Sequence, residues 1–126
     1  MDDKQRFDGG MTIRREVLGA EYVDRNMANA DEFSMAMQDL TTRYCWGDIW
    51  ARPGLDRKQR SMLNLAMIAT LNRPHELKAH VKGALTNGVT KDEIKEIFLQ
   101  VAVYVGVPAG MDSFRIAKEV FAEMGK

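Results

Sequence analysis

Leu85-Thr86-Asn87-Gly88-Val89-Thr90-Lys91-Asp92-Glu93-Ile94 ends one predicted helix and begins the next. Asn87-Gly88 is an ordinary signal for the C-terminal end of a helix, because glycine readily adopts the left-handed conformation found there. Thr90 and Glu93 have the spacing of a capping box, in which two side chains bind backbone N–H groups at the start of a helix. The stretch therefore predicts two helices joined by a short turn.

Helical spacing continues on both sides of this turn, and strands are hard to place. Pro74 suits the first turn of the upstream helix, and Pro108 after Gly106 marks a break downstream. The predicted helices run from Lys4 to Val17, from Asp31 through Tyr44, from Asp56 to about Leu71, from Pro74 to Asn87, from Thr90 to Val105, and through Phe114, Ala117 and Phe121. The helix that Asp56 caps is apolar nearly all round, so we expect it to be central and buried. Gly9-Gly10 weakens the N-terminal helix. The fold class is all-α, a single-domain bundle of about six helices over residues 1–126.

Composition excludes several classes of function. The chain of 126 residues has 18 Lys+Arg and 18 Asp+Glu, so its formal net charge is zero. No overall field therefore attracts nucleic acid or an anionic membrane. The single Cys45 cannot form an internal disulfide, and no apolar run approaches the roughly 18 residues of a membrane span. We expect a soluble cytoplasmic protein without nucleic-acid or membrane partners.

Glu76 and His80 form the compact pair of proton-handling groups in the chain. They stand four residues apart, so on a helix an acid and a base project side by side. His75 and His80 are five residues apart and point about 140° away from each other, which excludes the zinc-binding arrangement His-Glu-x-x-His. The sequence predicts no metal site. On spacing alone, a solvated surface pair is the more frequent alternative.

Four cations surround the start of the helix capped by Asp56, namely Arg52, Arg57, Lys58 and Arg60. The positive end of the helix dipole disfavours exposed cations there by roughly 0.3–1 kcal/mol each. A bound anion offsets this cost, and arginine can hold a carboxylate through two parallel hydrogen bonds. A solvated face or a salt-bridge network between subunits is the equal alternative.

Trp46 and Trp50 share a helical face in Tyr44-Cys45-Trp46-Gly47-Asp48-Ile49-Trp50. Two indoles this close usually belong to a core or a subunit interface, because each buries a large area. The other interpretation is an apolar wall for a ring-shaped ligand. Cys45 fits a small core hydrophobe better than a nucleophile, since no cationic neighbour in the sequence lowers its pKa.

These residues belong to motifs that resemble the carboxymuconolactone decarboxylase family over almost the whole chain. The motifs are Trp46-Gly47-Asp48-Ile49-Trp50-Ala51-Arg52-Pro53-Gly54-Leu55-Asp56-Arg57, Glu76-Leu77-Lys78-Ala79-His80, Asn87-Gly88-Val89-Thr90 and Tyr104-x-Gly106-x-Pro108. The tryptophan-containing motif is the narrower signature, and the C-terminal half is shared by a broad superfamily. Gly110-Met111-Asp112 departs from the small residues of the family pattern. If this segment faces the pocket, its bulk and charge alter the substrate accepted.

The resemblance implies an alkyl hydroperoxidase D-like fold, a homo-oligomer with a hexamer as the expected assembly, and a carboxy-lyase without cofactor or metal. The implied reaction converts γ-carboxymuconolactone, a small dicarboxylate lactone, to β-ketoadipate enol-lactone in aromatic catabolism, the β-ketoadipate pathway. The peroxidase relatives use a Cys-x-x-Cys pair, but Arg73 and Glu76 occupy those two positions and Ser61 the position of their glutamate. Thiol peroxidase chemistry is therefore excluded.

The resemblance also assigns roles at the site. The hypothesis is that His80 donates the proton or binds the developing oxyanion, and that Glu76 orients His80 or relays the proton. The substrate-binding residues are three arginines that share the carboxylates and two tryptophans that form an apolar wall, namely Arg52, Arg57, Arg60, Trp46 and Trp50. The alternative is a non-catalytic helical oligomeric or small-ligand-binding protein on the same scaffold.

Overall fold

The computed structural model describes residues 2–126, and every regular element in this part of the chain is helical. The elements in order are α1 (Asp3–Leu18), α2 (Ala20–Ala28), α3 (Met35–Leu40), the π-helix η1 (Thr41–Ile49), α4 (Arg57–Leu71), α5 (Pro74–Thr86), α6 (Lys91–Tyr104) and α7 (Val107–Met124). The all-α prediction is confirmed, with seven α-helices among the described residues against about six expected. The chain divides into two compact units, Met1–Asp56 and Arg57–Lys126. The single domain over residues 1–126 stays a prediction.

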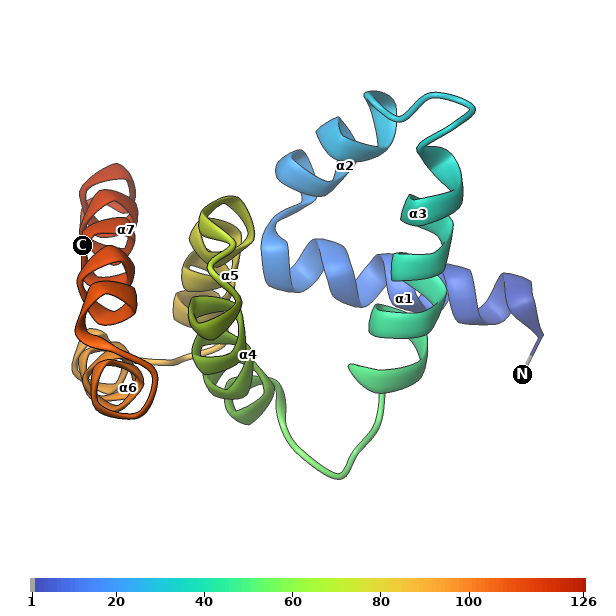
Figure 1. Ribbon diagram of the computed structural model, residues 1–126. Helices are drawn as coiled ribbons and strands as arrows, with labels where there is room; N and C mark the ends of the chain where they lie inside the picture. Colours follow the sequence, from blue (N-terminus) through green and yellow to red (C-terminus); the bar gives the residue numbers. More distant parts are fainter. Residues whose placement is uncertain (1) are drawn as a thin grey trace. The chain divides into compact units, whose positions relative to one another are not determined.

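The first unit is built on the contact between α1 and η1 (Figure 1). Gly9-Gly10 does not interrupt α1, because Gly10 lies where α1 meets η1. A Cβ atom on Gly10 would lie 2.1 Å from the carbonyl oxygen of Thr42 and 2.8 Å from the backbone nitrogen of Gly47. The helix-breaking residue in the sequence is therefore a close-packing residue in the structure.

The segment after Gly19 differs from the prediction. A helix that the sequence pattern missed, α2, follows Gly19, and the predicted helix from Asp31 is a turn followed by α3 and η1. Asp31 caps that turn, since its carboxylate accepts the backbone N–H of Ser34 at 2.8 Å. The apolar side chains that keep helical spacing here are exposed, from Phe33 at 92 % to Leu40 at 47 %.

The second unit packs α4, α5, α6 and α7 around one apolar core (Figure 1). Its buried members are Leu65, Ala69, Leu77, Val81, Ala84, Val89, Ile94, Phe98, Val101, Ala117 and Val120. The prediction that α4 is buried all round is wrong for one face, because Leu63, Met67 and Leu71 are each more than half exposed. Helix α4 thus contributes a single face to this core.

The turn between α5 and α6 forms as predicted. Gly88 has a φ of 92°, in the left-handed region that favours glycine. Thr90 and Glu93 complete the capping box of α6, with the Thr90 hydroxyl accepting the N–H of Glu93 at 3.0 Å. Among residues 2–126, no helix combines the length and apolarity needed to cross a membrane.

Candidate active site

Glu76 and His80 lie one turn apart near the start of α5. Arg73 directly precedes Pro74, the first residue of the helix, and takes the non-helical conformation that a residue before proline prefers. Glu76 is exposed in the first turn, where the positive end of the helix dipole favours a carboxylate. His80 is half-buried, and its Nδ1 atom is buried. The acid and the base therefore share one side of α5 but differ in exposure to water.

The charge state of His80 follows from this difference. Burial lowers the pKa of His80 to about 4, and the nearby Glu76 carboxylate raises it only in part. At neutral pH the imidazole is consequently uncharged. A neutral ring still has one N–H donor, so His80 can donate a hydrogen bond to an oxygen that becomes negative. The structure thus favours the oxyanion partner over an imidazolium donor in the free protein.

Arg73 has a structural role at the end of α4. Its guanidinium donates to the carbonyl oxygens of Leu71 at 3.2 Å and Asn72 at 3.3 Å. Cations are favoured at the C-terminal end of a helix, where carbonyl groups lack helical partners. Arg73 therefore stabilises the turn before α5.

The first turn of α4 carries three of the four predicted cations. Arg57 and Arg60 are half-buried, and the turn contains no acidic residue. Lys58 forms an ion pair with Glu93 of α6, with 3.2 Å between its Nζ and a carboxylate oxygen. Lys58 therefore has a partner within the unit, and Arg57 and Arg60 are the guanidinium groups of this turn, whose binding of an anion stays a prediction.

Asn87 connects this turn to the helix of His80. Its side-chain amide donates to the hydroxyl of Ser61 at 2.9 Å and to the carbonyl oxygen of Arg57 at 3.4 Å. Asn87 comes seven residues after His80, which is two helical turns or about 10 Å along the axis on nearly the same face. The α4–α5 hairpin therefore holds Glu76, His80, Arg57 and Arg60, with Arg60 one turn nearer to His80 than Arg57.

The predicted aromatic wall lies in the first unit. Trp46 and Trp50 stack with 4.6 Å between ring centroids and form a buried cluster with Val17. Only 2 % of Trp46 and 6 % of Trp50 is exposed, so both indoles belong to the core of this unit. Arg52 is exposed in the turn after η1. The first unit thus holds three of the predicted site residues and the second unit holds the other four; their substrate contacts stay predictions.

Cys45 behaves as the sequence predicts for a small core residue. Burial raises the pKa of its thiol, and the neighbouring Arg14 opposes this effect only in part. The side chain is half-buried beside the tryptophan cluster. A reactive thiolate is therefore disfavoured.

Two polar residues of structural importance were missed from the sequence. Arg14 of α1 is buried and donates to the Thr42 hydroxyl in η1 at 3.2 Å, and burial lowers the pKa of its guanidinium. Asn87 was interpreted as the end of a helix and as part of a family motif, without a contact to another helix. Helical spacing puts Arg14 on the same face of α1 as Gly10 and Val17, which are both buried. This shared face is the sequence signal that could have indicated that Arg14 is buried. Nothing in the sequence pairs Asn87 with Ser61.

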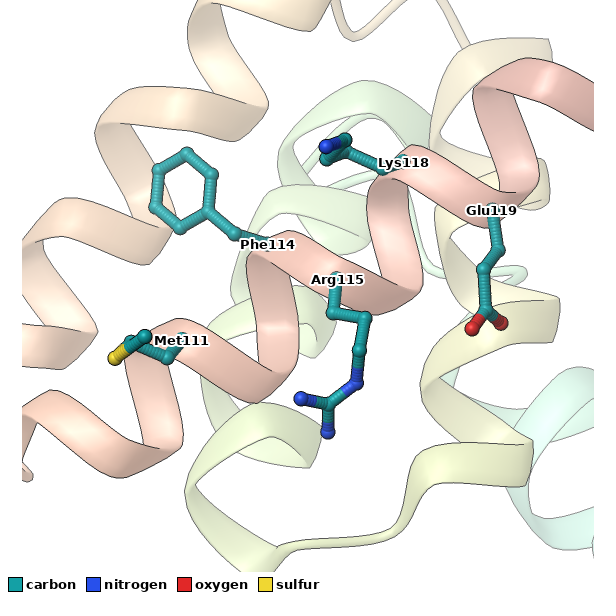
Figure 2. Close-up of a pocket in the computed structure, with 5 residues that line it drawn as sticks. All are labelled: Met111, Phe114, Arg115, Lys118 and Glu119. Atoms are coloured by element: carbon teal, nitrogen blue, oxygen red, sulfur yellow. The ribbon is translucent and has the colours of Figure 1, made fainter.

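A pocket of about 640 Å³ lies beside α7 in the second unit (Figure 2). It is lined by Met111, Phe114, Arg115, Lys118 and Glu119, all from α7. Met111, part of the predicted departure from the family pattern, therefore faces this pocket, while Asp112 forms an ion pair with Arg115. Within residues 2–126, no cluster of three or more His, Cys, Asp or Glu side chains has the arrangement of a metal site.

Comparison with known proteins shows the family to which the chain is similar. The model of the carboxymuconolactone decarboxylase family matches residues 36–119, two thirds of the chain. The chain belongs to the carboxymuconolactone decarboxylase family. This match includes all seven predicted site residues, from Trp46 to His80. The suggested resemblance is therefore confirmed at the level of the family.

The relatives that the chain resembles differ in the substrate that their names give. The chain is 41% identical over 125 residues to the 4-carboxymuconolactone decarboxylase of Acinetobacter baylyi, covering 99% of this chain and 93% of that protein. It is 42% identical over 121 residues to nitrosuccinic acid decarboxylase npaB of Metarhizium robertsii, covering 96% of this chain and 85% of that protein. A 4-carboxymuconolactone decarboxylase of Pseudomonas putida is 46% identical over 48 residues, 38% of this chain and 100% of that sequence. Both kinds of relative are named as decarboxylases.

Proposed function

We propose that this protein is a cofactor-free carboxy-lyase that decarboxylates 4-carboxymuconolactone to β-ketoadipate enol-lactone in aromatic catabolism. The observation that carries the proposal is the near full-length similarity to a 4-carboxymuconolactone decarboxylase, 41% over 99% of this chain. The arrangement of the α4–α5 hairpin supports it, because a dicarboxylate needs cationic groups and the reaction needs a hydrogen-bond donor.

The reaction can proceed without a cofactor because the substrate ring accepts the electrons. The bond between the γ-carbon and its carboxylate breaks, and carbon dioxide leaves. The electron pair of that bond enters the conjugated ring and reaches the lactone carbonyl oxygen, giving a dienolate. A proton then adds to carbon and forms the enol-lactone. The protein must bind two carboxylates, stabilise one oxyanion and deliver one proton.

The side chains of the hairpin match these three tasks. Arg57 and Arg60 bind carboxylate groups, for which the guanidinium fork is suited. Arg52 of the first unit stays a predicted carboxylate ligand. His80, uncharged because burial lowers its pKa to about 4, donates its N–H to the dienolate oxygen. Glu76 is exposed one turn earlier, so it relays a proton between water and the site.

Trp46 and Trp50 contribute to this proposal only indirectly. Both indoles are buried in the core of the first unit. Their role as an apolar wall that favours loss of a carboxylate as neutral carbon dioxide stays a prediction from the sequence.

A second candidate substrate is nitrosuccinic acid, supported by the 42% identity over 96% of the chain to a nitrosuccinic acid decarboxylase. Its chemistry makes the same demands. Nitrosuccinate has two carboxylates, and the nitro group next to one of them accepts the electron pair on its oxygens when carbon dioxide leaves. Either substrate needs arginines, an oxyanion donor and a proton relay. The two substrates differ in the group that accepts the electron pair, which is the lactone carbonyl in one and the nitro group in the other.

The test gives purified protein each substrate separately and measures carbon dioxide release together with ultraviolet absorbance. Faster kcat/KM with 4-carboxymuconolactone supports the main proposal, and faster kcat/KM with nitrosuccinate supports the second candidate. The variant His80→Asn serves as the catalytically impaired control. If neither substrate loses carbon dioxide while the lactone still binds in calorimetry, the protein is a binding protein on this scaffold.

Self-association belongs to the same proposal. Exposed apolar side chains form rows at helical spacing on α4 and on α3–η1, namely Leu63, Met67 and Leu71, and Phe33, Met37, Leu40 and Tyr44. Rows of this kind usually mark protein interfaces. A homo-oligomer, with a hexamer as the expected assembly, covers them with further copies of the chain. Light scattering at micromolar concentration measures the assembly, and a monomer would contradict it. A cytoplasmic location stays a prediction from the sequence.

A further inference from the structure

The side chain of Asn87, at the end of α5, contacts helix α4. These contacts are not required to end α5. The backbone dihedral angles of Asn87, φ −85° and ψ 7°, are open to any residue. The end of α5 is closed by backbone groups, with the N–H of Asn87 donating to Gly83 at 2.9 Å and that of Val89 to Ala84 at 2.9 Å. The side-chain amide is therefore not needed for the cap.

The amide of Asn87 instead holds the first turn of α4. It donates to the Ser61 hydroxyl at 2.9 Å and to the Arg57 carbonyl at 3.4 Å. Ser61 is 1 % exposed, so its contact with Asn87 is sheltered from water. A sheltered hydrogen bond fixes two helices relative to each other more effectively than an exposed one, because water does not compete for it.

A second contact restrains the same turn of α4 from the same direction. Lys58 pairs with Glu93, whose carboxylate also accepts the backbone N–H of Thr90 at 2.9 Å. Asn87 and Glu93 flank the short turn that joins α5 to α6. The turn therefore holds the start of α4 at two points, one neutral and one charged.

We propose that Asn87 is a positioning residue for the dicarboxylate, acting through the first turn of α4 that carries Arg57 and Arg60. This inference rests on the proposed function. Helix α5 also carries His80, on nearly the same face as Asn87 and two turns away. The amide therefore restrains the turn of α4 that carries the carboxylate-binding arginines. Loss of this restraint weakens substrate binding, whereas His80, two turns away on α5, keeps its own position.

The test replaces Asn87 in the full-length protein by Ala, and separately by Asp, which keeps the size but loses the amide donor. KM for the better substrate should rise roughly 3- to 10-fold, the equivalent of one lost hydrogen bond, with kcat and its pH profile within about twofold. Asn29 ends α2 with similar dihedral angles, φ −81° and ψ −9°, so Asn29→Ala is the matched control and should leave KM unchanged.

A double-mutant cycle assigns the effect to the contact. Ser61→Ala should raise KM less than Asn87→Ala, because the carbonyl of Arg57 still accepts from the amide. The double variant should be no worse than Asn87→Ala alone, since residues that act through one contact are not additive. Lower kcat with unchanged KM in the Asn87 variants would overturn the proposal, since it would indicate a general loss of folded enzyme.

A binding measurement separates this inference from the proposed function. Calorimetric titration with succinate, an inert dicarboxylate, should show the same 3- to 10-fold weakening in Asn87→Ala and little change in His80→Asn. If wild-type protein binds succinate in this way but decarboxylates neither substrate, the proposed function fails and the positioning role of Asn87 stands. Equal succinate affinity in wild type and Asn87→Ala, or no binding by wild type, would overturn the positioning role.

Discussion

Polar groups join helices in both units, but they differ in charge. In residues 1–56 the joining group is the buried guanidinium of Arg14, which donates to the hydroxyl of Thr42. In residues 57–126 it is the neutral amide of Asn87, which donates to the hydroxyl of Ser61. The first unit therefore buries a charge where two helices meet, whereas the charged contacts between helices of the second unit, such as Lys58–Glu93, are partly exposed.

The predicted site residues differ in the same way. Trp46 and Trp50 of the first unit are buried and form a core. Arg57 and Arg60 are half-buried and Glu76 is exposed, although all three belong to a well-packed hairpin. A charged side chain that stays near water keeps its solvation until a ligand replaces it. The comparison favours the second unit as the location of the proton-handling residues that we propose.

The largest effect that tests this division is expected at His80. Replacing His80 by Ala removes the oxyanion donor, and replacing it by Asn moves the N–H donor away from the imidazole position, so kcat should fall roughly 10²- to 10⁴-fold. Initial-rate measurements of carbon dioxide release give kcat, and His75→Asn on the same helix is the matched control. Turnover near that of wild type in His80→Asn would assign the chemistry to another group.

The packing of the first unit gives the next effect. In Gly10→Ala the new methyl group would lie 2.1 Å from the Thr42 carbonyl and 2.8 Å from the Gly47 nitrogen. Backbone atoms cannot move aside as a side chain can, so the free energy of unfolding should fall by about 3 kcal/mol or more.

Gly9→Ala is the natural control for this variant. A Cβ atom on Gly9 meets nothing within 4 Å, and alanine is the better helix former, so stability should rise by about 0.5–1 kcal/mol. Urea unfolding of both variants measures the difference. Equal stability of the two variants would mean that α1 and η1 do not pack as closely as the structure has them.

The two neighbouring glycines also show what sequence reasoning can reach. Helix starts and stops depend on local chemistry, so the turn from Asn87 to Glu93 was predictable residue by residue. Gly9-Gly10 was not predictable in this way, because its outcome depends on a tertiary contact. The close approach of Gly10 to η1 outweighs the local cost of glycine in a helix.

The candidate site was predictable only in part. Residue type and spacing identified Glu76 and His80 as a pair, and the structure adds the burial that makes His80 neutral. The contact between Asn87 and Ser61 joins residues 26 positions apart. No local pattern encodes such a contact, because it depends on how two helices align.

The burial of His80 predicts a smaller effect, on stability against pH. The pKa of His80 is lowered from 6.5 in the unfolded chain to about 4 in the fold. Between these values the unfolded chain binds more protons, so the free energy of unfolding is at its full value above pH 6.5 and falls as the pH falls toward 4. The loss due to His80 should amount to about 3 kcal/mol at pH 4.

Urea unfolding at several pH values from 7.5 to 4 checks this linkage in wild type and in His80→Asn. The variant should lose the part of the acid sensitivity due to this residue, and His75→Asn, at an exposed position of the same helix, should keep it. Identical pH curves for wild type and His80→Asn would show that the ring is hydrated in solution.

The smallest effect compares the capping boxes of the two units. Asp2 accepts the N–H of Gln5 at 2.7 Å at the start of α1, and Thr90 accepts that of Glu93 at 3.0 Å at the start of α6. Thr90→Ala should cost about 1 kcal/mol, because the first turn of α6 carries the Glu93–Lys58 ion pair to α4. Asp2→Ala should cost less, since residues 2–5 at the start of α1 are all exposed to solvent. Urea unfolding measures both variants, and an equal cost would mean that the start of α1 is as firmly held as the start of α6.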